Sequence, residues 1–183
     1  MAQNPETLMW KNLRAKMPKH WHTTRIENRF GGGIPDVHVC AESLAFWIEL
    51  KTTKTNRVNV SAHQVAWNFA YSQSGGVSFF LVAPLSSSNL YLFDGSRGRE
   101  LAEHGLKSGR VGDHGPGSVG SGSVGSGSVG SGSGPVGSGP GTMVPCLWSG
   151  SDQLGLQEFL IGYTRRRIGK PDPRAPRPGP GGV

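Results

Sequence analysis

The chain has 183 residues and a net charge of +7, with 35% hydrophobic residues and 29 glycines. This length fits one domain with appendages, and no apolar run approaches the roughly 18 residues of a membrane-spanning helix. A basic balance favours a polyanionic partner, nucleic acid first, over simple solubility charge. The two cysteines, Cys40 and Cys146, have no zinc-type spacing, so we expect a reducing, cytoplasmic setting.

The predicted elements begin with a helix over residues 4–17, which Asn4 caps and Pro18 ends. Strands are expected over residues 21–30, 34–40 and 45–52, separated by glycines at 31–33 and a turn at 41–44. A second helix over residues 61–72 starts at Ser61 and places Val65, Phe69 and Ser72 on one side. A strand over 77–84, apolar on both faces, a strand over 90–93 and a helix from 99 to 104 follow. The α-β-β-β-α-β-β order predicts an α/β domain.

Composition divides the rest of the chain. We expect the domain to span residues 1–106. Residues 107–141 carry a Ser-Val-Gly-Ser-Gly repeat that cannot bury enough apolar surface, so they are predicted to form a flexible linker. Residues 142–170 are interpreted as a separate basic segment with a helix over 152–167, which Gly155 and Gly162 weaken. Residues 171–183 are rich in Pro and Gly and are predicted to be disordered.

Three ionisable residues, Asp36, Glu49 and Lys51, lie inside runs that otherwise look buried, where such groups need a partner or a metal. Strand alternation puts Glu49 and Lys51 on one face and leaves the carbonyl of Leu50 near the same edge. A hairpin of the second and third strands would bring Asp36 to Glu49. Two carboxylates and a carbonyl suit Mg²⁺, and Lys51 would stabilise charge on a phosphate. The alternative is a structural ion pair.

Other chemistries lack their motifs. The six histidines show no H-x-E or H-E-x-x-H pattern, and the glycine tract has no Gly-Lys-Ser/Thr ending that would bind a nucleotide phosphate. No serine stands in a G-x-S-x-G turn. These absences leave the Asp36, Glu49 and Lys51 set as the candidate site.

The residues around this set resemble the PD-(D/E)xK nuclease superfamily. Pro35-Asp36 and Glu49-Leu50-Lys51 match its signature, and the glycine-led strand Arg29–Val37 with the Ser-x-x-Gln-x-x-Trp segment Ser61–Trp67 is similar to its VRR-NUC and Holliday-junction-resolvase-like branch. The resemblance spans residues 4–95. It implies a restriction-endonuclease-like αβββαβ core with a central mixed sheet, a Mg²⁺ cofactor for which Mn²⁺ is expected to substitute, DNA as the partner, and a homodimer.

The resemblance also assigns roles. Asp36 and Glu49 would be metal ligands with the Leu50 carbonyl, and Lys51 would be the catalytic lysine. Glu6 on the first helix matches a further metal ligand of the branch, although a first-turn Glu also suits the helix dipole. Gln64 matches a glutamine of the site, the alternative being a solvated helix residue. Arg25 and Glu27 are weaker candidates on the first strand.

Further contacts with nucleic acid are expected outside this set. Thr52, Lys54 and Arg57 begin a polar, basic loop that would contact phosphates without reading sequence, unless it is simply solvated. Arg165, Arg166 and Arg167 would tether DNA electrostatically, the alternative being an inert tail. Trp67 is interpreted as a core residue rather than a surface for stacking bases.

These observations predict a Mg²⁺-dependent DNA endonuclease that hydrolyses phosphodiester bonds. One form of the hypothesis is a structure-selective enzyme that cuts Holliday junctions or flaps. A second is a general or restriction-like DNA-degrading nuclease, and a third is a non-catalytic DNA-binding module on the same fold. The complete Asp36, Glu49 and Lys51 set disfavours the third.

Overall fold

A single mixed sheet organises the molecule. The computed structural model describes residues 4–26, 32–107 and 146–170. Six strands lie in the order β1-β2-β3-β4-β5-β6, and every neighbouring pair is antiparallel except the parallel pair β3 and β4. The strands are β1 (His22–Arg25), β2 (Val37–Ala41), β3 (Leu44–Thr53), β4 (Ser78–Pro84), β5 (Leu90–Asp94) and β6 (Trp148–Gly150).

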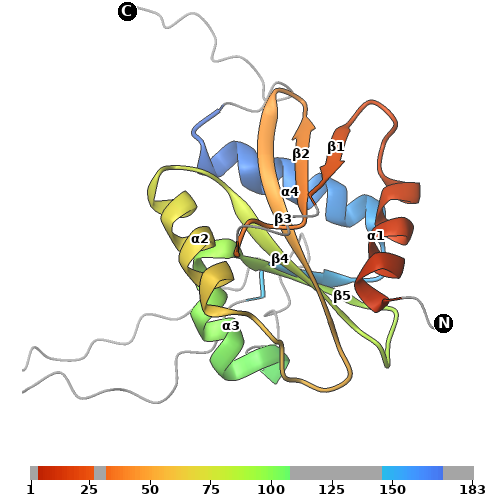
Figure 1. Ribbon diagram of the computed structural model, residues 1–183. Coiled ribbons are helices and arrows are strands. Elements are labelled where there is room, and N and C mark those ends of the chain that lie inside the picture. The colour runs from red at the N-terminus through yellow and green to blue at the C-terminus, as the bar shows by residue number, and fades with distance from the viewer. Residues whose placement is uncertain (1–3, 27–31, 108–145, 171–183) are drawn as a thin grey trace, which may run out of the picture.

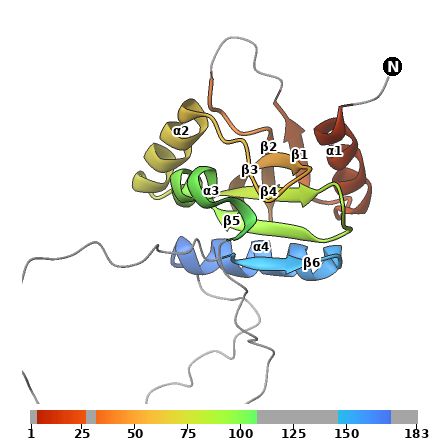
Figure 2. The same ribbon diagram turned by 90° about the horizontal axis from the view of Figure 1, so that it is seen from below.

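The helices are α1 (Pro5–Lys16), α2 (Ala62–Gln73), α3 (Gly98–His104) and α4 (Gln153–Arg167), with short 3₁₀ turns at Gly95–Arg97 and Gly105–Lys107. In Figure 1, α4 passes behind β2 and β3, whereas α2 and α3 lie together at the other side of the sheet, as Figure 2 also shows. The order from α1 to β4 is α-β-β-β-α-β, so the predicted restriction-endonuclease-like α/β core is confirmed.

The sheet has two faces with separate cores. One face, which we call the α1/α4 face, buries a large cluster that includes Leu13, Phe46, Ile48, Phe79 and Leu160. The opposite α2/α3 face buries a smaller cluster of Val58, Phe80, Val82, Phe93 and Leu101. Because β4 contributes alternate residues to both clusters, its predicted burial on both faces is confirmed.

Local sequence explains the element boundaries. The side chain of Asn4 accepts a hydrogen bond from the Glu6 amide at 2.9 Å, so the predicted N-cap of α1 is confirmed. The β2–β3 hairpin turns through Glu42 and Ser43, both with positive φ. Within the described part of the strand predicted over residues 21–30, β1 pairs with β2 from His22 to Arg25. Glu27 and Arg29 lie outside the described residues.

The expected separation of residues 142–170 from the domain differs from the structure. Strand β6 pairs with β5 in the same sheet, and α4 buries Leu156, Leu160 and Ile161 in the α1/α4 core. The helix is also tied to distant elements, because the Gln157 amide donates to the Lys16 carbonyl at 2.8 Å. The physical reason is that the apolar stripe of α4 needs an apolar surface, which the sheet offers on this face.

Several sequence expectations fall on residues that the structure does not describe. The linker expected over 107–141 and the tail expected over 171–183 lie almost wholly outside the described ranges. Among the described helices, none is long and apolar enough to cross a membrane.

Candidate active site

The structure brings Asp36, Glu49 and Lys51 together on the α2/α3 face. Asp36 immediately precedes β2, and the β2–β3 register pairs the next residue, Val37, with Ile48. The Asp36 carboxylate accepts a hydrogen bond from the Leu50 amide at 2.8 Å, which fixes it against β3. The ammonium group of Lys51 lies 3.1 Å from the Glu49 carboxylate. The hairpin therefore assembles the three side chains as the alternation of strand residues predicted.

The Glu49 carboxylate is buried yet incompletely partnered. Its side chain is 2% exposed, and its Oε1 receives both the Lys51 ammonium and the side-chain amide of Gln64. Its Oε2 is buried and has no hydrogen-bond partner among the described residues. The pKa of Glu49 is raised to about 7, first by burial and then by the nearby Asp36 carboxylate, while Lys51 acts in the opposite direction. An unpartnered buried carboxylate oxygen is costly unless something else binds it.

The Asp36 carboxylate has a related environment. Burial raises its pKa above the usual value, while the Leu50 amide and the positive charges of Lys51 and Arg25 act in the opposite direction. Two carboxylates with raised pKa values therefore lie beside one ammonium group. Buried carboxylates of like charge with raised pKa values mark a candidate functional site.

The first turn of α2 links Gln64 to the site. Ser61 and Gln64 form a capping box, in which the Gln64 amide donates to the Ser61 hydroxyl at 3.2 Å and the Ser61 amide donates to Gln64 Oε1 at 2.9 Å. The Gln64 side-chain nitrogen remains available and donates to Glu49 Oε1. The predicted site glutamine thus orients Glu49, and its own position is fixed by the start of the helix.

The glycines before Asp36 allow this approach. Gly33 has a φ of +98°, and a Cβ atom at Gly33 would lie 2.3 Å from the carbonyl oxygen of His63. A Cβ atom at Gly32 would meet the His63 ring at 3.1 Å. The segment that leads to Asp36 therefore lies directly against the first turn of α2, where only glycine fits.

Replacing Gly33 with Ala is expected to destabilise the protein by about 2–4 kcal/mol, since it combines a left-handed backbone with a clash against backbone atoms. Gly75→Ala is a matched control, because Gly75 has a φ of +82° but open space around it. That variant should lose only about 1 kcal/mol. Urea unfolding curves measure both values. Equal losses in the two variants would show that the contact with His63 does not restrict this position.

The metal role of Glu6 stays a prediction. Glu6 lies in the first turn of α1, close enough that its charge contributes to the raised pKa of Glu49. In the described part of the chain, however, no three His, Cys, Asp or Glu side chains gather into a group that could hold a metal. Arg25 donates to the Thr7 hydroxyl at 3.4 Å and acts on Asp36 through its charge.

The predicted nucleic-acid contacts at the end of β3 do not lie on one surface. Thr52 alternates with Lys51, so it faces α1 and contributes to a groove on the opposite face. Lys54 and Arg57 are exposed in the loop that follows β3. Hence Thr52 is not part of the surface around Lys51, whereas the loop remains next to it in the chain.

The three arginines of α4 are part of the folded domain. Arg165 lies 3.0 Å from the Glu42 carboxylate in the β2–β3 turn, and Arg167 donates to the Ser72 hydroxyl of α2 at 3.3 Å. Arg166 is exposed. The three arginines therefore lie on the folded domain and not on a free segment, while their contact with DNA stays a prediction.

One group of side chains near the site was not expected from the sequence. Trp47 contacts His38 at a ring-centroid distance of 4.6 Å and Trp67 at 5.6 Å, and Trp67 stacks on Tyr71 at 4.9 Å. All four residues are partly exposed. Trp67 was interpreted as a core residue, but it packs on these rings and belongs to neither core cluster of the described residues. The sequence could have indicated this group, because His38, Trp47 and Trp67 lie two or three residues from Asp36, Glu49 and Gln64, respectively.

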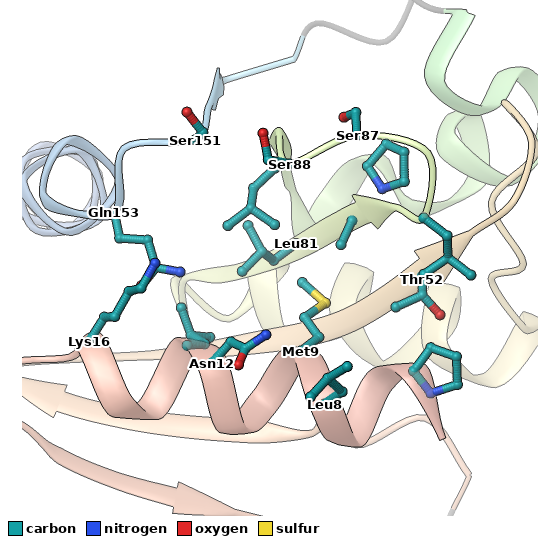
Figure 3. Close-up of a pocket in the computed structure, with 16 residues that line it drawn as sticks. Leu8, Met9, Asn12, Lys16, Thr52, Leu81, Ser87, Ser88, Ser151 and Gln153 are labelled. Atoms are coloured by element: carbon teal, nitrogen blue, oxygen red, sulfur yellow. The ribbon is translucent and has the colours of Figure 1, made fainter. Parts of the chain in front are cut away.

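A groove of about 540 Å³ lies on the α1/α4 face and is distinct from the site. Figure 3 shows it between α1, with Leu8, Asn12 and Lys16, and the segment of Ser87 and Ser88 that follows β4. Ser151 and Gln153 close its far side. Asp36, Glu49 and Lys51 do not line this groove, so it does not contribute to the candidate active site.

No protein-family model and no curated protein matches the chain. Among solved structures, the chain is similar to the Holliday junction resolvase Hjc of the archaeal hyperthermophile Archaeoglobus fulgidus. The identity is 17% and the TM-score is 0.41, over 50% of this chain and 74% of that chain.

Proposed function

We propose that the chain is a Mg²⁺-dependent nuclease of the PD-(D/E)xK type that hydrolyses DNA phosphodiester bonds, with branched DNA as the preferred substrate. The observation that carries the proposal is the buried, unpartnered Oε2 of Glu49 beside Asp36 and Lys51. A structural ion pair would satisfy both oxygens of a buried carboxylate. A site for a hard cation leaves one of them unpaired.

The donors around Glu49 fit a divalent metal. Asp36 and Glu49 would hold Mg²⁺ through their carboxylates, together with the carbonyl of Leu50, since Mg²⁺ prefers a few carboxylate and carbonyl oxygens and keeps several waters. Glu6, whose charge acts on Glu49 from α1, would be a further ligand. When bound, Mg²⁺ supplies Lewis-acid polarisation of the scissile phosphate. Mn²⁺ prefers the same ligands and should replace Mg²⁺.

Side chains of the protein carry out the remaining tasks in phosphodiester hydrolysis. Water attacks phosphorus, one P–O ester bond breaks, and the leaving oxygen takes a proton, so the products are a phosphomonoester and an alcohol. Lys51 places its ammonium where negative charge develops on the phosphate oxygens. Gln64 donates to Glu49 Oε1, so Oε2 has no hydrogen-bond partner among the described residues and would be available as a metal ligand. The Leu50 amide fixes Asp36 in the same way.

The substrate and assembly parts of the proposal rest on other features. The net charge of +7 favours a nucleic-acid partner. Selectivity for a junction or a flap, and a homodimer that presents two sites to it, come from the resemblance of the Pro35–Asp36 and Glu49–Lys51 motifs to resolvase-like nucleases.

Metal binding is expected to weaken as the pH falls below about 7. The pKa of Glu49 is raised to about 7, so a proton competes with the metal for Oε2 below that pH. The affinity for Mn²⁺ should fall roughly tenfold per pH unit below 7 and level off above it. Calorimetric titration with Mn²⁺ at several pH values measures this. Glu103→Gln, at an exposed position, is the control and should keep the same profile. A pH-independent affinity would contradict the assignment of Glu49 as a ligand.

The function is tested by incubating the protein with a four-way junction, a flap, a single strand and a linear duplex, each with Mg²⁺ and with a chelator. We expect cleavage that depends on Mg²⁺ and is fastest on the branched substrates. Equal cleavage of all substrates would indicate a general nuclease. Binding without cleavage would indicate a DNA-binding module, and cleavage that persists with chelator would contradict the metal site.

A further inference from the structure

We infer that the substrate carries unpaired nucleotides beside the scissile phosphate and that their bases stack on an aromatic row of His38, Trp47, Trp67 and Tyr71. The inference rests on the proposed nuclease function, since it describes how the same site would receive its substrate. It names a class of substrate, namely DNA with a single-stranded segment, that no motif of the chain specifies.

The row is continuous with the active site along three elements. His38 follows Asp36 by two residues on β2, and Trp47 precedes Glu49 by two residues on β3, so each lies on the same face as its neighbour. Trp67 follows Gln64 by three residues, about one turn of α2. The rings touch in sequence, His38 to Trp47, Trp47 to Trp67, and Trp67 to Tyr71. The row therefore lies next to the two carboxylates on the same face of the sheet.

Core packing does not account for these rings. Within the described residues, Trp47, Trp67 and Tyr71 belong to neither buried cluster and are not among the partly buried side chains packed against one. Each keeps part of its surface exposed. Figure 1 shows that α4 passes behind β2 and β3, while no helix of the described residues passes in front of them. Partly exposed aromatic rings on an open sheet can bind bases, since every base offers a flat π face.

The row is held rigidly enough to act as a platform. Tyr71 stacks on Trp67 with an interplanar angle of 20° and lies over Gly76, where a Cβ atom would be 2.3 Å from the Tyr71 ring. Trp67 meets Trp47 at 70°, an edge contact that fixes both rings. A preformed platform loses little side-chain entropy on binding, so its contacts add more to affinity.

Charge at the far end of the row favours a polyanion. Arg167 contacts Ser72, the residue after Tyr71, while Arg165 and Lys170 contact Glu42 and Ser43 in the turn between β2 and β3. Among the described residues on this face of β1, β2 and β3, including Asp36 just before β2, only Asp36 and Glu49 are acidic. A strand leaving the site would therefore cross uncharged rings and meet the basic end of α4.

The dimensions suit a few nucleotides. Six residues of β-strand separate Glu49 from Ser43, which corresponds to about 20 Å. Sheet platforms of this size stack roughly two or three bases. The distance from the carboxylates to the basic end of α4 therefore matches a short unpaired segment rather than a long single strand.

The test compares a fluorescent duplex that carries a short single-stranded tail with the same duplex with blunt ends. Ca²⁺ replaces Mg²⁺, so that binding is measured by anisotropy separately from cleavage. We expect Trp67→Ala to weaken binding of the tailed duplex about tenfold, as loss of a stacked base does, and to leave the blunt duplex unchanged. Trp67→Phe should restore most of the affinity. Phe69→Ala is the matched control, because Phe69 is a 52% exposed ring on another side of α2.

Four results would contradict the inference or the proposed nuclease function. Equal binding of tailed and blunt DNA by the wild type, or an equal loss for both in Trp67→Ala, would overturn the inference. A Trp67→Ala variant that instead loses self-association in sedimentation would show that the row joins two copies of the chain, and would also overturn it. If the wild type binds tailed DNA more tightly than blunt DNA but cleaves no DNA in Mg²⁺, the nuclease function would be contradicted. The inference that bases stack on the aromatic row would then be retained.

Discussion

Replacing Lys51 with Met is expected to lower the rate of Mg²⁺-dependent DNA cleavage by about 10²–10³-fold, the usual loss when one fixed donor to developing charge is removed. Lys51 is 12% exposed and its ammonium lies 3.1 Å from Glu49, so the charge acts in a poorly solvated site. Methionine keeps the length and the apolar stem of the side chain. Single-turnover kinetics on a labelled flap DNA measure the change.

Lys54→Met is the matched control for this experiment. Lys54 is an exposed lysine in the loop just beyond β3, so its loss should only reduce the salt dependence of binding. Both variants should bind DNA within a few-fold of the wild type. Comparable cleavage by Lys51→Met and the wild type would remove Lys51 from the catalytic set.

Replacing Leu160 with Ala is expected to lower the free energy of unfolding by about 2–5 kcal/mol, because the cavity would form in a fully buried part of the core. Leu160 is 0% exposed and packs in the α1/α4 core with Leu156 and Phe79. A loss of this size from a residue beyond the glycine tract would establish that α4 belongs to the domain. Urea unfolding monitored by tryptophan fluorescence measures the loss.

Leu154 provides the control on the same helix. Its side chain is 64% exposed, so Leu154→Ala should change the free energy of unfolding by no more than about 0.5 kcal/mol. If Leu160→Ala were as stable as Leu154→Ala, then α4 would not pack on the sheet as described.

Local patterns in the sequence predicted much of the fold. Period-two alternation located β2 and β3, and the caps Asn4 and Ser61 marked the starts of α1 and α2. The alternation also predicted that Glu49 and Lys51 share a face, and the hairpin confirmed the contact with Asp36. These features were predictable because each depends on residues close together in the chain.

The C-terminal part could not be predicted in this way. Strand β6 is only three residues long, and its pairing with β5 joins residues that more than fifty positions separate. In α4, glycines and a basic last turn weakened the expectation of a packed helix. The contact of Gln157 with Lys16 depends on tertiary packing alone. Local propensity carries no information about such contacts.

The orientation of α2 could not be predicted from the sequence either. Its apolar residues do not follow one stripe, so Phe69 looked like a core residue but is 52% exposed. The buried residue is Asn68, which is 0% exposed and donates to the Gln64 carbonyl at 2.9 Å. Gln64 also lies on the side of α2 that faces the sheet, where its side chain donates to Glu49. Trp67 contacts Trp47 on the same side of the helix.

The most direct test of the metal-dependent nuclease site is cleavage of a labelled flap DNA by the wild type and by Asp36→Asn under single-turnover conditions. The wild type should cut with Mg²⁺ and not with a chelator, and Asp36→Asn should be slower by about 10³-fold, since it loses several kcal/mol of charge stabilisation. The variant should keep its fold, because asparagine still accepts the hydrogen bond from the Leu50 amide. Cleavage by Asp36→Asn at the wild-type rate, or no cleavage by the wild type of any DNA in Mg²⁺ or Mn²⁺, would contradict the assignment.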